Sequence, residues 1–248
     1  MPGHMRQDLY PELFAVEDNH WWHQHKRALV RQWLKKWLPR PGRIIDVGSG
    51  TGKILEELKY EGWEVLGVDG AREAIHLSRK RGVEVKQVNL SKSKLPFAAN
   101  SFNAAICLDT LEHLEDDLGI LIEMRRIVKK GGIIIITVPA HPWLFSYWDK
   151  MLGHFRRYKK SDLLKLCKRS GLKLINISYL FSFLLLPAIA IRWFKKTLHL
   201  QEVSDFTDAP GYTLVMLPLQ ILGFLERTWL KYANVPLGLS LICVLKKK

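Results

Sequence analysis

The sequence predicts an α/β fold built on a mostly parallel sheet. From residue 42 onward, short apolar runs rich in β-branched residues alternate with longer segments of helical period. Strands and helices that alternate at this spacing form a parallel sheet with right-handed crossovers. The chain has 248 residues, of which 48% are hydrophobic and 25% charged, so it can bury a sizeable core and is neither disordered nor fibrous.

The predicted elements follow one another along the chain. A helix begins at His20 and runs through Trp33 and Trp37, ahead of the sheet. Beyond it we expect strands at 43–47, 64–69, 83–90, 103–109 and 131–138, separated by helices at 53–60, 71–81 and 116–129. The uninterrupted run from Ile133 to Ile136 is typical of a strand that is buried on both faces. A helix at 160–170 then leads to two further strands, at 171–179 and 238–245.

The cysteine and histidine patterns do not predict a metal site. Cys107, Cys167 and Cys243 have no CxxC pairing, so we expect reduced, structural cysteines and neither a disulfide framework nor a zinc site. His20, His23 and His25 lie close together in sequence, but no set of carboxylates accompanies them. We therefore expect no metal.

The charge is unevenly distributed. Thirty-eight Lys and Arg residues against 24 Asp and Glu give a net charge of +14, which is typical of proteins that meet nucleic acid, an anionic membrane or an acidic substrate. Residues 1–42 carry +3, residues 43–150 are neutral and residues 151–248 carry +11. The last hundred residues are therefore the candidate contact surface.

A glycine-rich turn, Asp46-Val47-Gly48-Ser49-Gly50-Thr51-Gly52, follows the first strand of the sheet. Its alternate glycines allow a tight turn and close approach of the backbone to a ligand at the start of the next helix. A P-loop is excluded because the glycine spacing is too short and Lys53 is followed by Ile54; the dinucleotide pattern GxGxxG also fails. Asp46 would repel a pyrophosphate, whereas a ligand with amino and sulfonium groups would be favoured.

A second carboxylate, Asp69, ends the next strand, nineteen residues beyond Gly50, where it can accept hydrogen bonds from both ribose hydroxyls of an adenosine. With this pair, the chain resembles the class I S-adenosylmethionine-dependent methyltransferases of the type 11/23 branch, in which the first strand ends as DxGxGTG. The resemblance covers about residues 40 to 140. It continues through Asn89-Leu90, the segment from Leu108 to Leu114, and Ile127-Val128-Lys129-Lys130-Gly131-Gly132.

The resemblance implies a Rossmann-like seven-stranded sheet of order 3-2-1-4-5-7-6 and S-adenosylmethionine as cofactor. Asp46 and the glycine turn would hold its methionine part, Asp69 its ribose, and Gly70, Ala71, Asn89 and Leu90 its adenine. Asn89 stands where the family usually has Asp, but its carbonyl oxygen can accept the same hydrogen bond. Leu108 and Asp109 would close the pocket opposite the turn. The expected cofactor-binding residues are Asp46, Gly48, Ser49, Gly50, Thr51, Gly52, Asp69, Gly70, Ala71, Asn89, Leu90, Leu108 and Asp109.

About sixty mostly apolar residues separate the last two predicted strands, where the family has a short turn. Residues 174–191 and 209–225 carry no charge, but strand residues and prolines interrupt them, so we expect neither to span a membrane. Basic and aromatic flanks, including Arg192–Lys196, suit helices that lie in the interface of an anionic membrane. A lid packed on the sheet or in a dimer is the alternative. We expect a single domain, with a cap region at 1–42, a core at 43–179 and 238–246, and this insertion at 180–233.

The segment from Pro139 to Tyr158 leaves the carboxyl end of a parallel strand, where ligands of such folds bind. Its aromatic residues can wall an apolar substrate, and its two adjacent arginines can pair with a phosphate or carboxylate. Methyl transfer needs a base only when the acceptor must lose a proton; His141 and His154 are the candidates. The expected substrate-binding residues are Trp21, Trp22, Trp143, Arg156, Arg157 and Tyr158.

The pattern as a whole predicts a methyltransferase for an apolar or lipid-linked acceptor, such as an isoprenoid, quinone precursor, phospholipid or glycolipid. The N-terminus is polar and shows no signal peptide, so we expect the inner face of the cell membrane. Asp109-Thr110-Leu111-Glu112 stands where amino-methylating enzymes of nucleic acids carry an Asn/Asp-Pro-Pro-aromatic tetrad, which disfavours a nucleic-acid substrate. The alternatives are a soluble small-molecule methyltransferase with a hydrophobic lid, and an RNA-binding protein with a vestigial cofactor fold.

Overall fold

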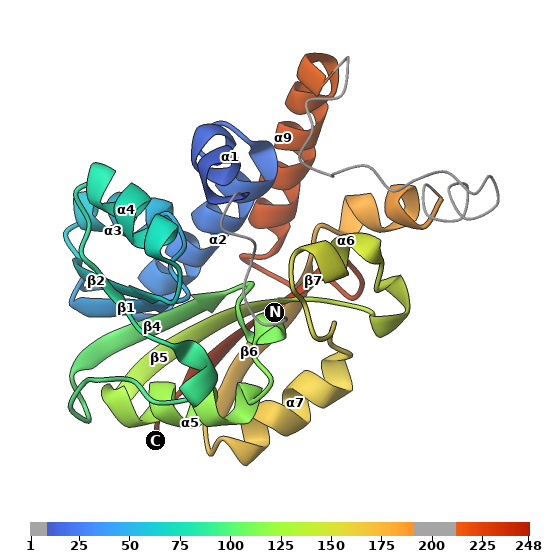
Figure 1. Cartoon of the computed structure of the whole chain (residues 1–248). Helices are drawn as coiled ribbons and strands as arrows, with labels where there is room; N and C mark the ends of the chain where they lie inside the picture. Colours follow the sequence, from blue (N-terminus) through green and yellow to red (C-terminus); the bar gives the residue numbers. More distant parts are fainter. Residues whose placement is uncertain (1–8, 191–211) are drawn as a thin grey trace.

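A seven-stranded sheet runs through the molecule (Figure 1). The structure, a computed structural model, describes residues 9–190 and 212–248, without the side chains of residues 212–215. The strand order is β3-β2-β1-β4-β5-β7-β6, which confirms the predicted order. The strands are β1 Arg43–Val47, β2 Glu64–Asp69, β3 Val85–Gln87, β4 Phe102–Leu108, β5 Val128–Pro139, β6 Lys173–Leu180 and β7 Ser240–Lys246.

Strands β1 to β5 pair in parallel, whereas β7 lies antiparallel between β5 and β6. In this register Asp46 of β1 lies opposite Gly67 of β2 and Ile106 of β4. The carboxyl ends of β1, β2 and β4 therefore meet at one edge of the sheet. The glycine turn and Asp69 lie at this edge, as the alternation of strands and helices predicts.

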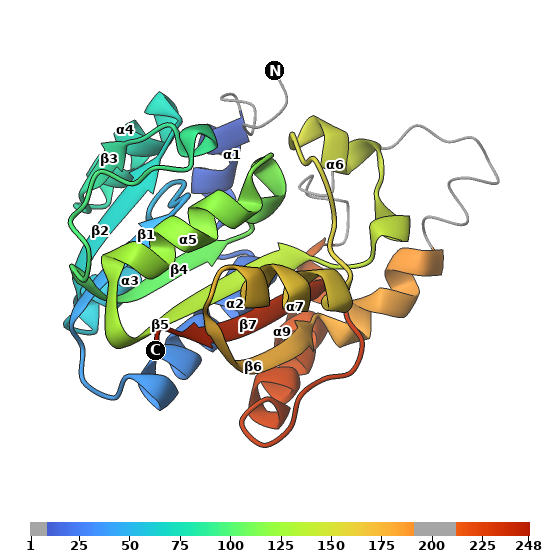
Figure 2. The ribbon, with the colours of Figure 1, turned by 90° about the horizontal axis from the view of Figure 1, so that it is seen from below.

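Helices cover both faces of the sheet. Helices α5 and α7 lie on one face, and α2 and α9 lie on the other (Figure 2). Ion pairs from Arg27 and Arg31 to Glu57 join α2 to α3, and α1 packs on α4 through Tyr10. The helices are α1 Leu9–Val16, α2 Trp21–Trp37, α3 Lys53–Tyr60, α4 Arg72–Lys80, α5 Asp117–Ile127, α6 Tyr147–Met151, α7 Lys160–Arg169 and α9 Tyr212–Trp229. Short 3-10 helices are η1 Leu90–Lys92, η2 Leu111–His113, η3 Pro142–Leu144 and η4 Ser182–Leu184.

The core explains the composition of the central strands. Because helices cover both faces, residues 133–136 of β5 and 241–245 of β7 are all buried, and their sequences are apolar without alternation. All three cysteines are buried and free, as expected. The same core takes in Leu230 and Val235, which follow α9, so the end of the insertion packs with the sheet.

The insertion differs from the expected interfacial helices in one respect: α9 lies against α2. The side chain of His25 approaches Gly223 so closely that a Cβ there would lie 2.9 Å from its Nδ1 atom. Residues 182–190 form η4 and a following helical segment, while the predicted flank Arg192–Lys196 lies outside the described residues. No helix within residues 9–190 and 212–248 is long and apolar enough to cross a membrane.

Candidate functional site

A cavity of about 620 Å³ lies at the carboxyl ends of β1, β2 and β4. It extends from the glycine turn to η4 and the helical segment behind it. Its wall contains most of the residues expected to bind the cofactor, together with several expected to bind substrate. Those present are Trp21, Trp22, Asp46, Gly48, Ser49, Gly50, Thr51, Asp69, Gly70, Leu90, Leu108, Asp109, His154 and Arg157.

The glycine turn is held in a conformation that only glycine adopts easily. Gly48 has φ +83°, and a Cβ at this position would lie 2.3 Å from Oγ1 of Thr110. The backbone N–H groups of Gly48 and Ser49 both donate to the carbonyl of Val68, which ties the turn to β2. Gly52 lies at the N-cap of α3 with φ +79° and does not line the cavity.

Asp69 is fixed by the backbone around it. Its Oδ2 accepts a hydrogen bond from Gly50 N at 2.9 Å, and its Oδ1 accepts one from Ala71 N at 2.9 Å. Each carboxylate oxygen can accept more than one hydrogen bond, so the group can still bind a pair of hydroxyls. Ala71 itself does not line the cavity.

Asp46 is buried beside the turn, and its Oδ1 has no hydrogen-bond partner in the described part of the chain. Ser49 Oγ is likewise without a partner there. Burial, and then the charge of Asp69, raise the pKa of Asp46 to about 8, although the Lys26 ammonium opposes the shift. A ligand that brings amino and sulfonium groups would supply both a donor and a positive charge here, so these residues fit the cofactor that the motifs imply.

Lys26 enters the cavity from α2 and pairs with Oδ2 of Asp109. The other oxygen of Asp109 accepts a hydrogen bond from Thr137 Oγ1 at 2.8 Å. Burial alone would raise the pKa of Asp109, but Lys26 and Thr137 bring it below its ordinary value. Sequence reasoning missed Lys26, because only the packing of α2 over the cavity brings this lysine to β4.

The N-terminal region also covers the glycine turn, through Glu17. Thr51 Oγ1 donates to the buried Glu17 carboxylate, which also pairs with Arg81 at 3.0 Å. Glu17 and Tyr10 both line the cavity. The short helix that carries Tyr10, α1, was not predicted at all.

Several expected site residues lie elsewhere. Asn89 Oδ1 caps η1 by accepting from Ser91 N at 3.0 Å, and Asn89 does not line the cavity. His141, Trp143 and Tyr158 are also absent from its wall. His141 Nε2 donates to Gly238 O at 2.9 Å and the His141 ring stacks on Tyr179, while Trp143 is largely exposed.

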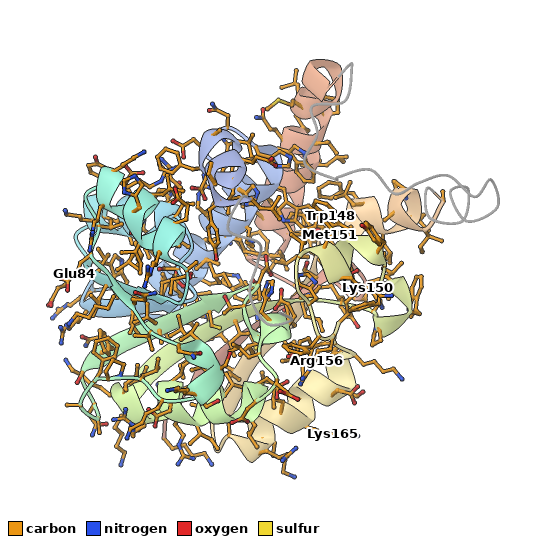
Figure 3. All side chains as sticks on the ribbon, viewed as in Figure 1. Glu84, Trp148, Lys150, Met151, Arg156 and Lys165 are labelled. Atoms are coloured by element: carbon orange, nitrogen blue, oxygen red, sulfur yellow. The ribbon has the colours of Figure 1, made fainter. Side chains whose placement is uncertain are left out.

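Arg156 and Tyr158 point to the same acidic partner. Arg156 pairs with Asp117 at 3.0 Å and also donates to Glu115 O, and Tyr158 donates to the Asp117 carboxylate at 2.8 Å. Figure 3 shows Arg156 beside α7. The structure therefore separates the two neighbouring arginines: Arg157 lines the cavity and Arg156 does not.

Two further carboxyl groups lie near His154 and Arg157 and are not among the expected site residues. Glu112 lines the cavity and is fully buried, and Asp149 lies behind His154 and Arg157. The spacing from Ser146 to Asp149 is a capping-box signal, which the structure contains at the start of α6. That signal indicates a helix start, so it did not reveal the contacts of Asp149 with the site.

Comparisons with known proteins agree with the fold and with the expected kind of cofactor. The family model described as "Methyltransferase domain" matches residues 21–177. A ubiquinone biosynthesis O-methyltransferase from Alkalilimnicola ehrlichii is 33% identical over 117 residues, which are 45% of this chain and 47% of the relative. A demethylmenaquinone methyltransferase from Renibacterium salmoninarum is 30% identical over 103 residues, 41% of this chain and 44% of the relative. The matches therefore span about half the length of these two relatives.

Solved structures share the fold over nearly the whole chain. One from Thermotoga maritima, described as a SAM-dependent methyltransferase and possible histamine N-methyltransferase, has a TM-score of 0.60 at 20% identity and covers 97% of this chain and 96% of its own. A phosphoethanolamine N-methyltransferase 2 from Haemonchus contortus, solved with S-adenosylhomocysteine, has a TM-score of 0.58 at 19% identity, with 91% and 52% covered. With the family model matching well over half of the sequence, the chain belongs to the S-adenosylmethionine-dependent methyltransferases.

Proposed function

We propose that this methyltransferase acts on an apolar or lipid-linked small molecule, such as a prenylated quinone precursor, at the surface of an anionic membrane. The cofactor supplies a methyl group on a sulfonium, and the protein aligns an acceptor with that group and excludes water. The single observation that carries the proposal is the continuity of the cavity, which runs from the glycine turn to the first residues of the apolar insertion.

The end of the cavity away from the glycine turn has an apolar wall. Leu184, Pro187 and Ala188 of the insertion contribute to it, together with Trp148 and Leu152. Figure 3 shows Trp148 on α6, beside the start of the insertion. A wall of this composition suits a hydrocarbon chain better than a polar acceptor.

Helix α2 of the N-terminal cap region and the insertion make an aromatic contact beside this wall. Trp22 of α2 stacks on Phe181 with ring centroids 3.6 Å apart, and Trp21 meets the same ring edge-on at 6.0 Å. Both tryptophans line the cavity. We propose that they bind the acceptor, as expected from the sequence, and shield the transfer from water.

Helix α9 presents an apolar face to solvent next to this region. Leu217, Ile221 and Phe224 follow helical spacing and are 64%, 51% and 60% exposed; Trp229 is 60% exposed. Leu186, in the helical segment that walls the cavity, is 75% exposed. Such a surface, with Lys36 and Lys231 beside the end of α9, suits insertion among acyl chains at an anionic leaflet.

The relatives support an acceptor of this class. Two are named for ubiquinone biosynthesis and demethylmenaquinone methylation, and a third, from Xanthomonas axonopodis pv. citri, is a ubiquinone biosynthesis O-methyltransferase that is 26% identical over 194 residues. We place the protein on the cytoplasmic face of the membrane, whose anionic lipids attract basic surfaces.

The acceptor class is tested by incubating the protein and methyl-labelled cofactor with a total bacterial lipid extract and, separately, with its water-soluble fraction. Label in an organic-soluble product supports the proposal. Label confined to water-soluble products would instead favour a soluble enzyme with a lid, for which the buried contact between α2 and α9 is the supporting observation.

Membrane attachment is tested by flotation with phosphatidylglycerol vesicles. Replacing Leu217, Ile221 and Phe224 by Gln removes about 3 kcal/mol of apolar transfer, so binding should weaken on the order of 100-fold. Tyr60→Gln is the matched control, because Tyr60 is 86% exposed on α3. Flotation that is the same for both variants, or absent in the unaltered protein, contradicts the proposal.

A further inference from the structure

Asp149 is a buried carboxylate that holds two cavity residues at once. His154 Nδ1 lies 2.9 Å from its Oδ1, and Arg157 Nε donates to the same oxygen at 2.7 Å. Its Oδ2 accepts from Ser146 N at 2.8 Å and from Ser146 Oγ at 3.1 Å. Burial alone would raise the pKa of Asp149, but the hydrogen bonds from His154 and Arg157 bring it well below its usual value.

The ionised carboxylate determines how the His154 ring carries its proton. A carboxylate only accepts hydrogen bonds, so the neutral imidazole must carry its hydrogen on Nδ1 and its lone pair on Nε2. Nε2 makes no hydrogen bond within residues 9–190 and 212–248, and His154 lines the cavity. The ring therefore presents a proton acceptor on the side away from Asp149.

Arg157 is held in the same way. Its Nε atom is bound to Asp149, and its two terminal nitrogens have no hydrogen bond to the described residues, although its side chain is only 11% exposed. Since Arg157 also lines the cavity, these nitrogens are available to an anionic atom of a ligand.

Other titratable groups surround His154. From η2, Glu112 and His113 each place a ligand atom within 4.8 Å of one on His154, and the two imidazole rings meet edge-on at 4.6 Å. Both carboxyl oxygens of Glu112 lack a hydrogen-bond partner among the described residues. Burial, and then the charge of Asp109, raise the pKa of Glu112 well above its ordinary value, so it adds a neutral acid to this end of the cavity.

We propose that Asp149 is a positioning residue that orients His154 as a general base and Arg157 as an anion-binding group, for an acceptor that is a phenolic or enolic hydroxyl. This inference rests on the proposed methyltransferase function and specifies oxygen as the atom methylated.

His154 Nε2 takes the hydroxyl proton as the oxygen forms its bond to the methyl carbon. The carbon–sulfur bond breaks, its electron pair stays on sulfur, and the imidazolium then returns its proton to solvent. Arg157 stabilises the negative charge that develops on the oxygen and disfavours a cationic amine.

The test compares farnesylated catechol, farnesylated aniline and catechol without the chain, with kcat and KM measured for each. Methylation of the catechols and not of the aniline is expected. Asp149→Asn should lower kcat about 100-fold and leave KM nearly unchanged, because an amide no longer fixes the orientation and tautomer of the His154 ring. Arg157→Gln should mainly raise KM. Asp162→Asn, at an exposed carboxylate of α7, should change neither parameter.

The outcomes separate this inference from the proposed function. Equal turnover of catechol with and without the farnesyl chain contradicts the lipid-linked acceptor and leaves the base assignment intact. Methylation of the aniline, or a kcat that Asp149→Asn leaves unchanged, overturns the assignment. Loss of activity on chelation, restored by a divalent cation, also overturns it, because Glu112, His113 and His154 would then hold a metal.

A second measurement does not depend on turnover or on the folding of the Asp149 variant. In the 15N spectrum of histidine-labelled protein, one neutral imidazole should be protonated at Nδ1, and its signals should disappear in His154→Gln. Protonation of His154 at Nε2 in the unaltered protein overturns the inference.

Discussion

Asp46 is the last residue but one of β1 and is buried, and its ionisation is linked to cofactor binding. Burial and the charge of Asp69 hold its pKa at about 8 in the free protein, so at neutral pH most molecules carry this carboxyl protonated. A cationic ligand binds best to the ionised form. Affinity for the cofactor should therefore increase by up to about 100-fold between pH 6 and about pH 8 and then level off. Below about pH 8, binding should release a proton from Asp46.

Calorimetry from pH 6 to 9, in buffers of different ionisation enthalpy, measures both effects. Asp46→Asn should bind weakly and without this pH dependence. Asp69→Asn should also bind weakly but shift the rise in affinity to lower pH, because the Asp69 charge contributes to the high pKa of Asp46. An affinity that stays constant from pH 6 to 9 in the unaltered protein is inconsistent with this account.

Gly48 has a left-handed backbone conformation and lies close to the Thr110 side chain, so Gly48→Ala should destabilise the protein for two reasons. Positive φ costs an alanine about 1–2 kcal/mol, and the new Cβ would also overlap Thr110. Gly82→Ala isolates the first effect, because Gly82 has φ +68° and no atom within 4 Å of an added Cβ. In urea unfolding we expect a loss of at least about 3 kcal/mol at Gly48 and about 1–2 kcal/mol at Gly82. Equal losses would mean that the Thr110 contact is unimportant.

At the level of residues, the sequence predicted what local motifs encode and missed what tertiary packing supplies. The glycine turn and Asp69 follow from strand ends in a known register, and both line the cavity. Lys26 reaches the site through the packing of α2, and Asp149 of α6 reaches it through the contact that His154 makes after the end of this helix; the sequence carries no periodic signal for either contact. Arg156 and Arg157 are adjacent in the sequence, but Arg156 pairs with Asp117 and Arg157 with Asp149, a difference that no sequence pattern indicates.

At the level of elements, a buried carboxylate joins the insertion to the cap helix. Glu226 of α9 accepts from His25 of α2 at 2.8 Å, from the backbone N–H groups of Phe181 and Ser182 at 2.9 and 2.7 Å, and from Ser182 Oγ. Its side chain is 3% exposed. One side chain thus links α2, the end of β6 and α9.

Glu226→Ala should leave the buried N–H of Phe181, the partly buried N–H of Ser182 and the His25 ring without their acceptor, which costs about 3 kcal/mol. Glu84→Ala, at the exposed position labelled in Figure 3, should stay within about 0.5 kcal/mol of the unaltered protein. Burial alone would raise the pKa of Glu226, but His25 and Ser182 bring it below its ordinary value, so this stabilisation should be present at neutral pH and fade as the pH falls. Thermal unfolding at pH 7 and pH 4 measures the loss of stability in each variant and its dependence on pH. A loss of stability in Glu226→Ala no larger than in Glu84→Ala would contradict the proposed link.

The predicted strands and helices of the sheet are present, with differences at their ends that have local causes. The expected strand at 83–90 is reduced to β3, because Asn89 caps the 3-10 helix that begins at Leu90. Strand β5 starts at Val128 and not at Gly131, since Val128 already pairs with Phe102 of β4. Helix α1 lacks a strong apolar period, and its position follows from contact with α4, so no sequence pattern indicated it.

At the scale of the whole molecule, the basic charge and the apolar surface are only partly in the same place. Of the sixteen Lys and Arg residues between 151 and 248, eight lie between Arg156 and Lys173. Much of this group is on and around α7, and Figure 2 shows α7 on the opposite face of the sheet from α9. The net charge of a segment therefore overstates the positive charge near its apolar helix, because a sequence count does not distinguish the faces of a sheet.

This arrangement gives a test with two double variants that have the same net charge but lose it from different faces of the sheet. Lys36 and Lys231 lie exposed beside the end of α9, and Lys165 and Lys168 lie exposed on α7. If α9 meets the membrane, each lysine beside it contributes about 1 kcal/mol near an anionic surface. Replacing Lys36 and Lys231 by Gln should then weaken flotation with phosphatidylglycerol vesicles about 30-fold and reduce its salt dependence. The Lys165 and Lys168 pair should change binding less than about threefold. Equal losses from the two pairs would show that attraction depends on total charge, and a larger loss from the α7 pair would place the membrane on the other face of the sheet.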